Sequence, residues 1–291
     1  MKKTVFALLA ALVLLPVGVQ ARTKAPASLK VISYNIRLGT AKDGTNSWNL
    51  RYPASALMIN DQKPDIFGLQ EAFDFQKNYL DEACKGYSCV GVGRDDGKNK
   101  GEQMAIFYNT KRIKLRKWGT FWLSETPDAP SMGWDAACIR ICTWTHLKDR
   151  ASGKKLWFFN LHMDHVGTVA RAESAKLIVR NIEERCQPSE YVFVTGDFNV
   201  DQTDGIFSTF TESDVLTDSF GKAADRLFFT GTYNAFDPDR YTAGRIDHIF
   251  VSPTVRVDNF AVRTDTYRSP AEEGAESVAR CPSDHFPVFL K

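Results

Sequence analysis

The chain has 291 residues, of which 43% are apolar and 25% are charged. These fractions are ordinary for a folded soluble protein, so they exclude long disordered tracts and fibrous repeats, and the length allows one large domain or two small ones. The 37 basic and 35 acidic residues nearly balance, which excludes a general binder of polyanions but leaves room for a local basic patch.

Residues 1–21 have the pattern of a cleavable export signal. Lys2 and Lys3 precede an apolar stretch at 5–19, and the segment ends in small residues. Since this stretch is shorter than the ~20 residues that span a bilayer, we expect no transmembrane segment and a mature chain starting near Arg22. Removing the two lysines takes the 37 basic residues to 35, equal to the 35 acidic ones. The expected location is the periplasm or the outside of the cell, which the pattern does not separate.

Export also changes the interpretation of the six cysteines, which could form up to three disulfides in an oxidising compartment. The sequence does not choose among the many pairings. Cys138 and Cys142 are poor partners, because a single strand would hold them about 13 Å apart. No CxxC spacing is present, so a cysteine metal site is the weaker alternative.

Strand-like segments recur along the rest of the chain. Residues 139–147 alternate apolar and polar side chains, which predicts one buried face, and residues 191–195 are nearly all apolar, which predicts two. The basic and apolar alternation at 111–117 favours an exposed edge strand protected by charge, with a phosphate-backbone track as the alternative. The predicted strands, in chain order, are 29–37, 65–70, 103–109, 139–147, 155–161, 191–195, 246–251, 255–262 and 286–290.

Helical segments fall between some of these strands. An apolar stripe at spacings of three and four predicts a helix over 168–186, ended by Pro188, and 53–61 and 74–83 are shorter candidates. No linker or internal repeat marks a domain boundary. Strands interleaved with a few helices favour an α/β fold of two sheets packed face to face with helices outside.

Acid, amide and imidazole side chains stand at the ends of the predicted strands. Strand ends at one edge of a layered fold converge, and hard oxygen ligands beside imidazoles suit a Mg²⁺ phosphoester site. Taken singly, each residue also has an ordinary explanation as a turn former, a helix cap or a core histidine. The residues are Asn35, Glu71, His162, Asp164, His165, Asp197, Asn199, Asp247, His248, Asp284 and His285.

In this order the motifs resemble those of the endonuclease/exonuclease/phosphatase superfamily, which includes deoxyribonuclease I, abasic-site endonucleases, deadenylases, sphingomyelinases and inositol phosphatases. The motifs are Tyr-Asn-Ile-Arg (34–37), Leu-Gln-Glu (69–71), Asn-Leu-His (160–162), Gly-Asp-Phe-Asn (196–199), Ile-Asp-His-Ile-Phe (246–250) and Ser-Asp-His-Phe-Pro (283–287). The resemblance implies one domain over 22–291 with the four-layer α/β/β/α sandwich of two mixed sheets. The stretches at 48–51, 91–97, 101–108 and 119–127 are similar to a secreted bacterial subgroup of unassigned substrate.

The resemblance also implies a metal site. Glu71 would be the principal ligand of Mg²⁺, with Mn²⁺ as an alternative metal. Asn35 would help directly or through water, and Asp284 would complete the metal side. Asp197 and Asn199 would orient the attacking water and the phosphate.

Two histidines have implied roles at the phosphate. Asp247 would hold His285 and raise the basicity of its ring. His162 would contact a phosphate oxygen, with Glu102 as its partner. The group that takes the proton from water stays open between the His285–Asp247 pair and Asp197.

The substrate is less well defined by the sequence. Loops at 38–51, 91–101 and 124–135 combine tryptophan, arginine and acids that could grip a sugar or polyol phosphate, the acids taking hydroxyls and arginine the phosphate. The candidate substrate-binding residues are Arg37, Trp48, Arg51, Arg94, Asp95 and Trp134.

The sequence therefore favours an exported phosphoesterase acting on a sugar, polyol or lipid-headgroup phosphate. The main alternative is an extracellular deoxyribonuclease I-like nuclease, although Phe73 stands where that enzyme has a minor-groove arginine. A catalytically silent binding module is a third hypothesis, but no ligand of the site is missing. No protein partner is implied.

Overall fold

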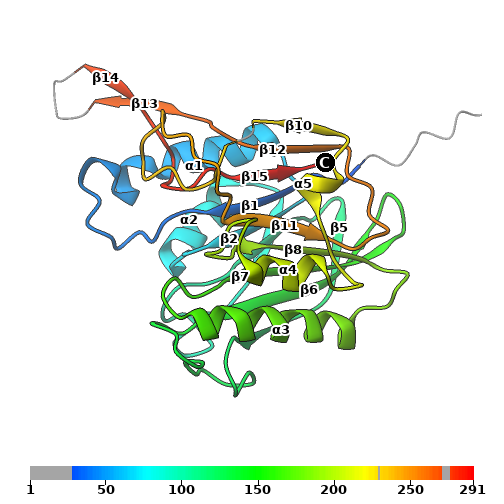
Figure 1. Cartoon of the computed structure of the whole chain (residues 1–291). Helices are drawn as coiled ribbons and strands as arrows, with labels where there is room; N and C mark the ends of the chain where they lie inside the picture. The colour runs from blue at the N-terminus through cyan, green and yellow to red at the C-terminus, as the bar shows by residue number, and fades with distance from the viewer. Residues whose placement is uncertain (1–27, 229, 271–275) are drawn as a thin grey trace, which may run out of the picture.

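The computed structural model describes residues 28–228, 230–270 and 276–291. The predicted export signal at residues 1–21 therefore lies outside the described residues. Two mixed β-sheets pack face to face and helices cover their outer sides (Figure 1). This arrangement confirms the predicted four-layer α/β/β/α sandwich.

The first sheet is built around β1 and β2, which run parallel with Asn35 opposite Gln70. Along β1, Val31 packs between the two sheets, whereas Ile32 and Tyr34 pack on the outer side. Alternation along the strand thus buries both faces of this sheet. Its seven strands, in spatial order, are β10 (Asp225–Leu227), β12 (Asn259–Val262), β15 (Val288–Leu290), β1 (Val31–Asn35), β2 (Ile66–Gln70), β4 (Ile106–Asn109) and β3 (Tyr87–Val90).

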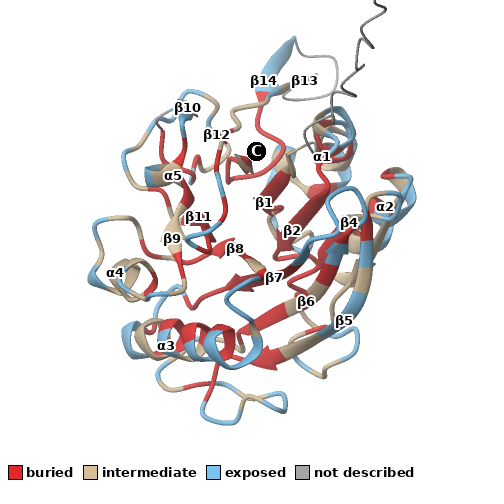
Figure 2. Cartoon of the chain, turned by 90° about the vertical axis from the view of Figure 1, so that its right-hand side faces the viewer, coloured by how far each residue is buried: buried red, intermediate tan, exposed pale blue. Residues whose placement is uncertain are grey.

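The second sheet is built around β7 and β8, which are parallel with His162 opposite Asp197. β11 runs antiparallel to β8 and places Asp247 opposite Asp197. The apolar residues of β8 are buried on both faces, as predicted (Figure 2). The six strands, in spatial order, are β5 (Ile113–Trp122), β6 (Ile141–Asp149), β7 (Lys155–His162), β8 (Tyr191–Asp197), β11 (Asp247–Val251) and β9 (Thr217–Asp218).

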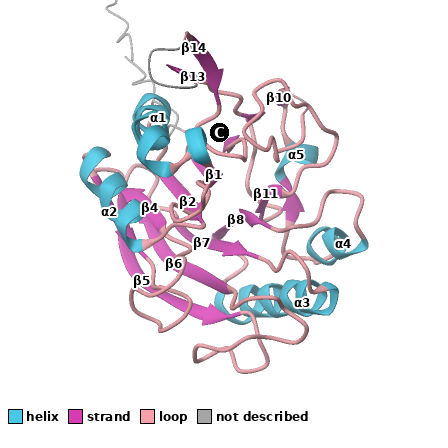
Figure 3. Ribbon diagram, turned by 90° about the vertical axis from the view of Figure 1, so that its left-hand side faces the viewer, coloured by secondary structure: helices cyan, strands magenta, loops and turns pink. Residues whose placement is uncertain are grey.

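Helices form the outer layers (Figure 3). On the first sheet, Ile59 of α1 and Leu80 of α2 pack with Phe67. On the second sheet, Ile178 of α3 packs with Val194. None of the helices within the described residues is long and apolar enough to cross a membrane. The remaining elements are α1 (Trp48–Gln62), α2 (Asp74–Ala83), α3 (Thr168–Arg185), α4 (Gly205–Thr211), α5 (Ser219–Lys222), the 3₁₀ turn η1 (Gly44–Asn46) and the hairpin of β13 (Tyr267–Pro270) and β14 (Ser277–Arg280).

The basic run at 111–117 lies at the start of β5, which is the outermost strand of its sheet. Lys114, Arg116 and Lys117 are exposed there, and a bulge interrupts the pairing between Leu115 and Lys117. Charge and a bulge both oppose pairing with another sheet. The edge-strand prediction is confirmed.

A buried polar link joins the two sheets below the strand ends. Asn160 donates to the backbone oxygens of Leu69 and Ala105, and its own side-chain oxygen accepts from Gln70 at 2.6 Å. Gly68 lies against this amide, and a Cβ at Gly68 would come within 2.4 Å of Asn160 Oδ1. The glycine therefore allows the close approach that fixes the two sheets relative to each other.

Candidate active site

The predicted polar residues meet at one edge of the sandwich. Asn35, His162 and Asp197 are the last residues of β1, β7 and β8, and Glu71 directly follows β2. Because β1 and β2 are parallel, as are β7 and β8, their carboxyl ends reach the same edge. Asp247 begins β11, which is antiparallel to β8, so it reaches that edge too. The predicted convergence is present.

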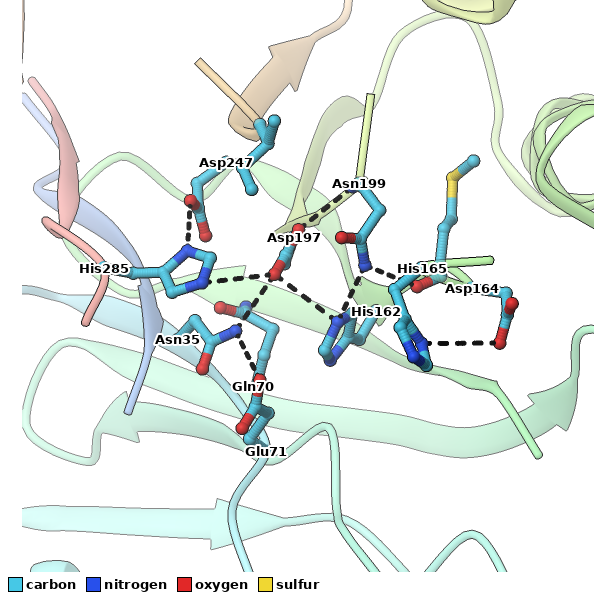
Figure 4. Close-up of polar contacts among 12 residues, drawn as sticks. Asn35, Gln70, Glu71, His162, Asp164, His165, Asp197, Asn199, Asp247 and His285 are labelled. Carbon is cyan, nitrogen blue, oxygen red and sulfur yellow. Dashed lines mark hydrogen bonds and ion pairs between the residues drawn. The ribbon is translucent and has the colours of Figure 1, made fainter. Parts of the chain in front are cut away.

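Asp197 lies at the centre of this cluster (Figure 4). Its Oδ2 accepts from Asn35 Nδ2 at 3.0 Å and lies 3.4 Å from His162 Nε2 and 3.8 Å from His285 Nε2. Its Oδ1 accepts from the backbone N–H of Asn199. Burial, together with the nearby charge of Asp247, raises the pKa of Asp197 to about 7. Asp197 thus touches groups delivered by both sheets.

The carboxylate of Glu71 accepts hydrogen bonds from two donors at the end of β1 and just beyond it. Asn35 Nδ2 donates to its Oε1 at 3.0 Å, and the backbone N–H of Leu38 donates to its Oε2 at 2.8 Å. The amide oxygen of Asn35 accepts from the backbone N–H of Arg37. Asn35 therefore turns its nitrogen, not its oxygen, to the carboxylates. In this arrangement Asn35 positions Glu71 and Asp197, and its predicted help at the metal, directly or through water, stays a prediction.

Three residues of the cavity wall have a left-handed backbone. The φ angles are 57° at Arg37, 60° at Glu71 and 51° at Asn199. Each lies one or two residues beyond the end of β1, β2 or β8. Such a conformation is costly for residues other than glycine and is concentrated at functional sites. Here it turns the chain sharply at the strand end, so that the side chains face the cavity.

His285 forms a buried pair with Asp247. Nδ1 of the ring lies 2.8 Å from Asp247 Oδ2, so Nε2 is left to face Asp197. Burial alone would lower the pKa of His285, but the carboxylates of Asp247 and Asp197 raise it well above its usual value. The implied His285–Asp247 pair is therefore formed, with the ring held in its charged state.

His162 has the opposite electrostatic environment. Its Nε2 lies 3.1 Å from the amide nitrogen of Asn199, which also donates to the backbone oxygen of Met163. This network assigns Nε2 as an acceptor and the ring proton to Nδ1, which is buried without a partner among the described residues. Burial, with the charge of Arg140, lowers the pKa of His162 well below its usual value. A neutral ring with an unsatisfied N–H can donate to a phosphate oxygen.

Glu102 is not the partner of His162 as predicted. Its Oε2 accepts instead from Arg94 Nη1 at 2.9 Å. The charge of the guanidinium makes this bond stronger than one to a neutral imidazole, which explains the different pairing. Burial raises the pKa of Glu102, and Arg94 opposes that shift.

A cavity of about 410 Å³ opens in front of these residues, a size suited to a small ligand. The predicted residues that line it are Arg37, Glu71, Arg94, Glu102, His162, Asp197, Asn199, Asp284 and His285. Asn35 and Asp247 lie behind this wall and contact its residues.

Four predicted substrate-binding residues do not line the cavity. Trp48, the first residue of α1, has its side chain buried in the hydrophobic core. Arg51, fully buried, donates to backbone oxygens of Ile36, Arg37, Asn46 and Pro282. Both were expected in a loop, but α1 begins at Trp48 and turns them inward.

The other two lie in loops outside the cavity. Asp95 points to solvent with its side chain 51% exposed and lies 3.8 Å from Arg94. The backbone N–H of Trp134 donates to the carboxylate of Glu125. Neither residue lines the cavity, and the direction of a loop side chain has no periodic signal in the sequence. Their predicted role in substrate binding stays a prediction.

The structure adds Leu38, Cys138, Arg140, His165 and Tyr233 to the cavity lining, residues that the sequence did not single out as substrate contacts. Arg140 bonds to His165 Nδ1 at 3.0 Å and to Asp164 Oδ2 at 3.3 Å. Tyr233 lies edge-on to the ring of His285, with 5.2 Å between centroids. For Arg140 the sequence did contain a signal, because a charged residue within the predicted strand at 139–147 is expected to be paired or functional if it is buried. Tyr233 is in a long loop, where no such signal exists.

Asp164 has a structural role at the cavity rim. Its carboxylate accepts from the backbone N–H groups of Val166 and Gly167 and from Arg140. Burial alone would raise the pKa of Asp164, but these donors hold it well below its usual value. Its acceptor positions are thus occupied by the protein itself.

The expected disulfides are not formed, because all six cysteines are free. Cys84, Cys142 and Cys281 are buried in three different hydrophobic clusters. Cys138 lines the cavity instead.

The donor set fits a hard divalent cation. Glu71, His162 and Asp197 each offer a ligand atom, all within 4.8 Å of one another. Burial raises the pKa of both Asp197 and Asp284, and the nearby negative charge of Asp247 or of Glu71 adds to each shift. A dication would relieve the repulsion between these carboxylates, and carboxylate oxygens are its preferred ligands.

Hydrolysis of a phosphoric ester needs positive charge on one side of phosphorus and hydrogen-bond donors on the other, because negative charge builds on its oxygens. The carboxylates and the two imidazoles supply these groups, and each kind comes from both sheets. Fold and site together define a hydrolase of phosphoric esters. More narrowly, residues 32–285 match the model of the Endonuclease/Exonuclease/phosphatase family, and the chain belongs to this family.

Several solved structures are similar over nearly the whole chain. A mannosyl-6-phosphatase of Bacteroides thetaiotaomicron VPI-5482 is 49% identical, with a TM-score of 0.87 over 91% of this chain and 99% of that chain. A family protein of Bacteroides vulgatus is 36% identical, with a TM-score of 0.79 over 90% and 97%. A functionally unknown conserved protein of Enterococcus faecalis V583 is 28% identical, with a TM-score of 0.79 over 90% and 98%.

Proposed function

We propose that this chain is an exported, Mg²⁺-dependent phosphatase that removes phosphate from a sugar phosphomonoester, with hexose 6-phosphates as the substrate class. The similar structure from Bacteroides thetaiotaomicron is a mannosyl-6-phosphatase, which supports a sugar phosphate over a lipid headgroup. The size of the cavity, about 410 Å³, is in keeping with a hexose phosphate.

The charge of the cavity wall carries the choice of a small ester over nucleic acid. Arg37 pairs with Asp43 at 3.0 Å, Arg94 with Glu102 at 2.9 Å and Arg140 with Asp164 at 3.3 Å. Each arginine that lines the cavity in the described part of the chain is thus neutralised. A polyanion needs several unpaired cations along its backbone, whereas one phosphate needs only the centre of the site.

Roles follow from the contacts. Glu71, with Asp284 beside it, would hold the divalent cation, whose chemistry when bound is to neutralise charge on the phosphate oxygens. His285 lies between two carboxylates as a cation and donates from Nε2, while His162 donates from Nδ1. Since His285 is held protonated, Asp197 is the better of the two open candidates for accepting the proton from water.

Phosphate release from a panel of esters tests the proposal. The panel holds hexose 6-phosphates, inositol phosphates, phosphocholine lipids, DNA and RNA, each with Mg²⁺ and with a chelator. We expect release from hexose 6-phosphates that the chelator abolishes. Glu71→Gln should lower it by about 10²- to 10⁴-fold, the range typical for loss of one catalytic group. Nicking of plasmid DNA at catalytic concentrations, lost in the same variant while hexose phosphates stay intact, would establish the nuclease instead. Inertness toward the whole panel would favour a binding module.

Export is a separate proposal that rests on residues 1–21. The basic start and short apolar stretch support it. N-terminal sequencing of the protein recovered from periplasm and medium should find a chain starting near Arg22. Recovery of the intact chain in the cytoplasmic fraction alone would contradict it.

A further inference from the structure

One ion pair of the cavity wall has no part in the roles proposed above for the phosphate chemistry. Arg94 Nη1 donates to Glu102 Oε2 at 2.9 Å, and the two side chains are only 16% and 9% exposed. The backbone N–H of Arg94 also donates to the backbone oxygen of Glu102. The indole N–H of Trp122 donates to the backbone oxygen of Arg94 at 2.7 Å. The pair is therefore rigidly placed.

Stability alone does not explain this pair. Taking two charges out of water costs several kcal/mol per ion, and a buried pair often gains no more than well-packed apolar residues would. The pair also leaves polar atoms unused. Within the described residues, Arg94 makes its side-chain hydrogen bond through Nη1 alone, with Asp95 3.8 Å from its Nε, and Glu102 makes its hydrogen bond through Oε2 alone. A donor and an acceptor are thus left side by side in the wall.

We propose that the Arg94–Glu102 pair binds hydroxyl groups of the sugar that leaves with the ester oxygen, and so sets the preference for sugar phosphates. The inference rests on the proposed function. A hydroxyl group both donates and accepts, so a carboxylate next to a guanidinium satisfies it fully. Because the pair has no net charge, it suits a neutral polyol and offers little to a second phosphate.

The two other arginine pairs at the cavity cannot take this role. Arg37 donates from Nε and Nη2 to the two carboxylate oxygens of Asp43, so both of those oxygens are occupied. Asp164 already accepts from two backbone N–H groups and from Arg140, and Arg140 is also bonded to His165. The carboxylate of Asp164 and the guanidinium of Arg140 therefore already have hydrogen-bond partners within the protein. The Arg94–Glu102 pair is the one with atoms to spare.

The test compares two primary phosphate esters on six-membered rings, one with hydroxyl groups and a ring oxygen and one with neither. Mannose 6-phosphate is set against cyclohexylmethyl phosphate, a primary phosphate ester on a six-membered ring without hydroxyls. The variants are Glu102→Gln, Arg94→Gln and the double variant, which removes both charges and leaves neither buried alone. Each enzyme is measured for kcat/KM with the sugar phosphate and for the competitive inhibition constant of the hydroxyl-free ester. Because unfolded protein lowers kcat/KM but leaves an inhibition constant unchanged, kcat/KM is normalised to the folded fraction of each sample, measured by urea unfolding.

We expect kcat/KM for mannose 6-phosphate to fall by about 10- to 100-fold in each variant, as for loss of a hydrogen bond to a charged group. The inhibition constant of cyclohexylmethyl phosphate should change by less than about threefold. Glu190→Gln is the matched control, because Glu190 is a similarly buried carboxylate, 8% exposed, bonded to Trp157 away from the cavity. It should change neither quantity.

Two results would overturn the inference. Equal losses with both esters would mean that the pair acts on the phosphate or the cation, and unchanged kinetics would mean that the sugar lies elsewhere. A wild-type enzyme that is inert toward mannose 6-phosphate and does not bind the hydroxyl-free ester would instead refute the proposed function. The two failures are therefore distinguishable.

Discussion

The change Asp247→Asn tests whether His285 works as part of a charged pair. Asp247 Oδ2 lies 2.8 Å from His285 Nδ1, and the two side chains are 1% and 6% exposed, so water cannot replace the lost interaction. Asn keeps the shape of the side chain but removes its charge. Asp247 Oδ1 is buried without a partner among the described residues, so the new amide N–H₂ would meet no acceptor there.

The magnitude follows from this environment. A hydrogen bond to a charged group contributes about 1.5–3 kcal/mol, which corresponds to about 10- to 150-fold in rate. Where loss of the carboxylate also leaves the imidazole in the wrong tautomer, the loss reaches ~10⁴. We therefore expect kcat to fall by about 10²- to 10⁴-fold, with KM changed by less than about threefold, because the pair contributes mainly in the transition state.

The assay is initial-rate phosphate release from mannose 6-phosphate at saturating Mg²⁺, with urea unfolding as a check that the variant folds. His285→Gln and the double variant complete the set. If the pair acts as a unit, the double variant is no slower than His285→Gln alone. Losses that multiply in the double variant, or an Asp247→Asn enzyme with more than half of the wild-type rate, would refute the reasoning.

Three further changes test stability. Arg51→Met should lower the free energy of unfolding by about 2–4 kcal/mol in urea titrations, because four buried backbone oxygens lose their donor; a loss under 1 kcal/mol would contradict this. Gly68→Ala should cost a similar amount and lower the melting temperature, since its Cβ would come within 2.4 Å of Asn160 Oδ1, and an unchanged melting temperature would count against the sheet contact. Burial lowers the pKa of His248 to about 4. The unfolded chain therefore binds a proton below about pH 6.5 that the folded protein does not, and stability is full above that pH and falls by about 3 kcal/mol as pH drops to 4. His248→Gln should flatten that part of the pH dependence in urea titrations, and identical acid limbs would contradict it.

Periodicity predicted the elements that bury long apolar faces. β8 and α3 fall within a few residues of their expected bounds because their alternation or stripe faces a hydrophobic cluster. Elements without such faces were not expected. β9 has two residues, and β10 is half exposed, so they are strands only because neighbours in the fold supply partners. Local sequence carries little signal of that kind.

The catalytic centre was predictable because polar motifs directly follow apolar strands, and the strand ends fix where they lie. The substrate wall was not. Arg51 was expected in a loop because Pro53 reads as a first helical residue, whereas the helix starts earlier at Trp48 and turns Arg51 into the core. Glu102 was expected on His162, and a competing guanidinium nearby in space drew it to Arg94. Which of two possible partners a carboxylate pairs with depends on distances in the folded structure, and the spacing of residues along the sequence does not give those distances.

The position of Asn35 links catalysis to the packing of the two sheets. Its amide nitrogen donates to Glu71, beyond the end of β2 in the first sheet, and to Asp197, at the end of β8 in the second, both at 3.0 Å. Neither sheet alone therefore carries the complete site. The two imidazoles also come from both sheets, His162 from β7 and His285 from the chain before β15. A cation or phosphate bound among these groups must therefore favour the packed sandwich over any state in which the sheets separate. Substrate and metal should thus protect the inner faces of both sheets from opening, even though they touch only one edge of the fold.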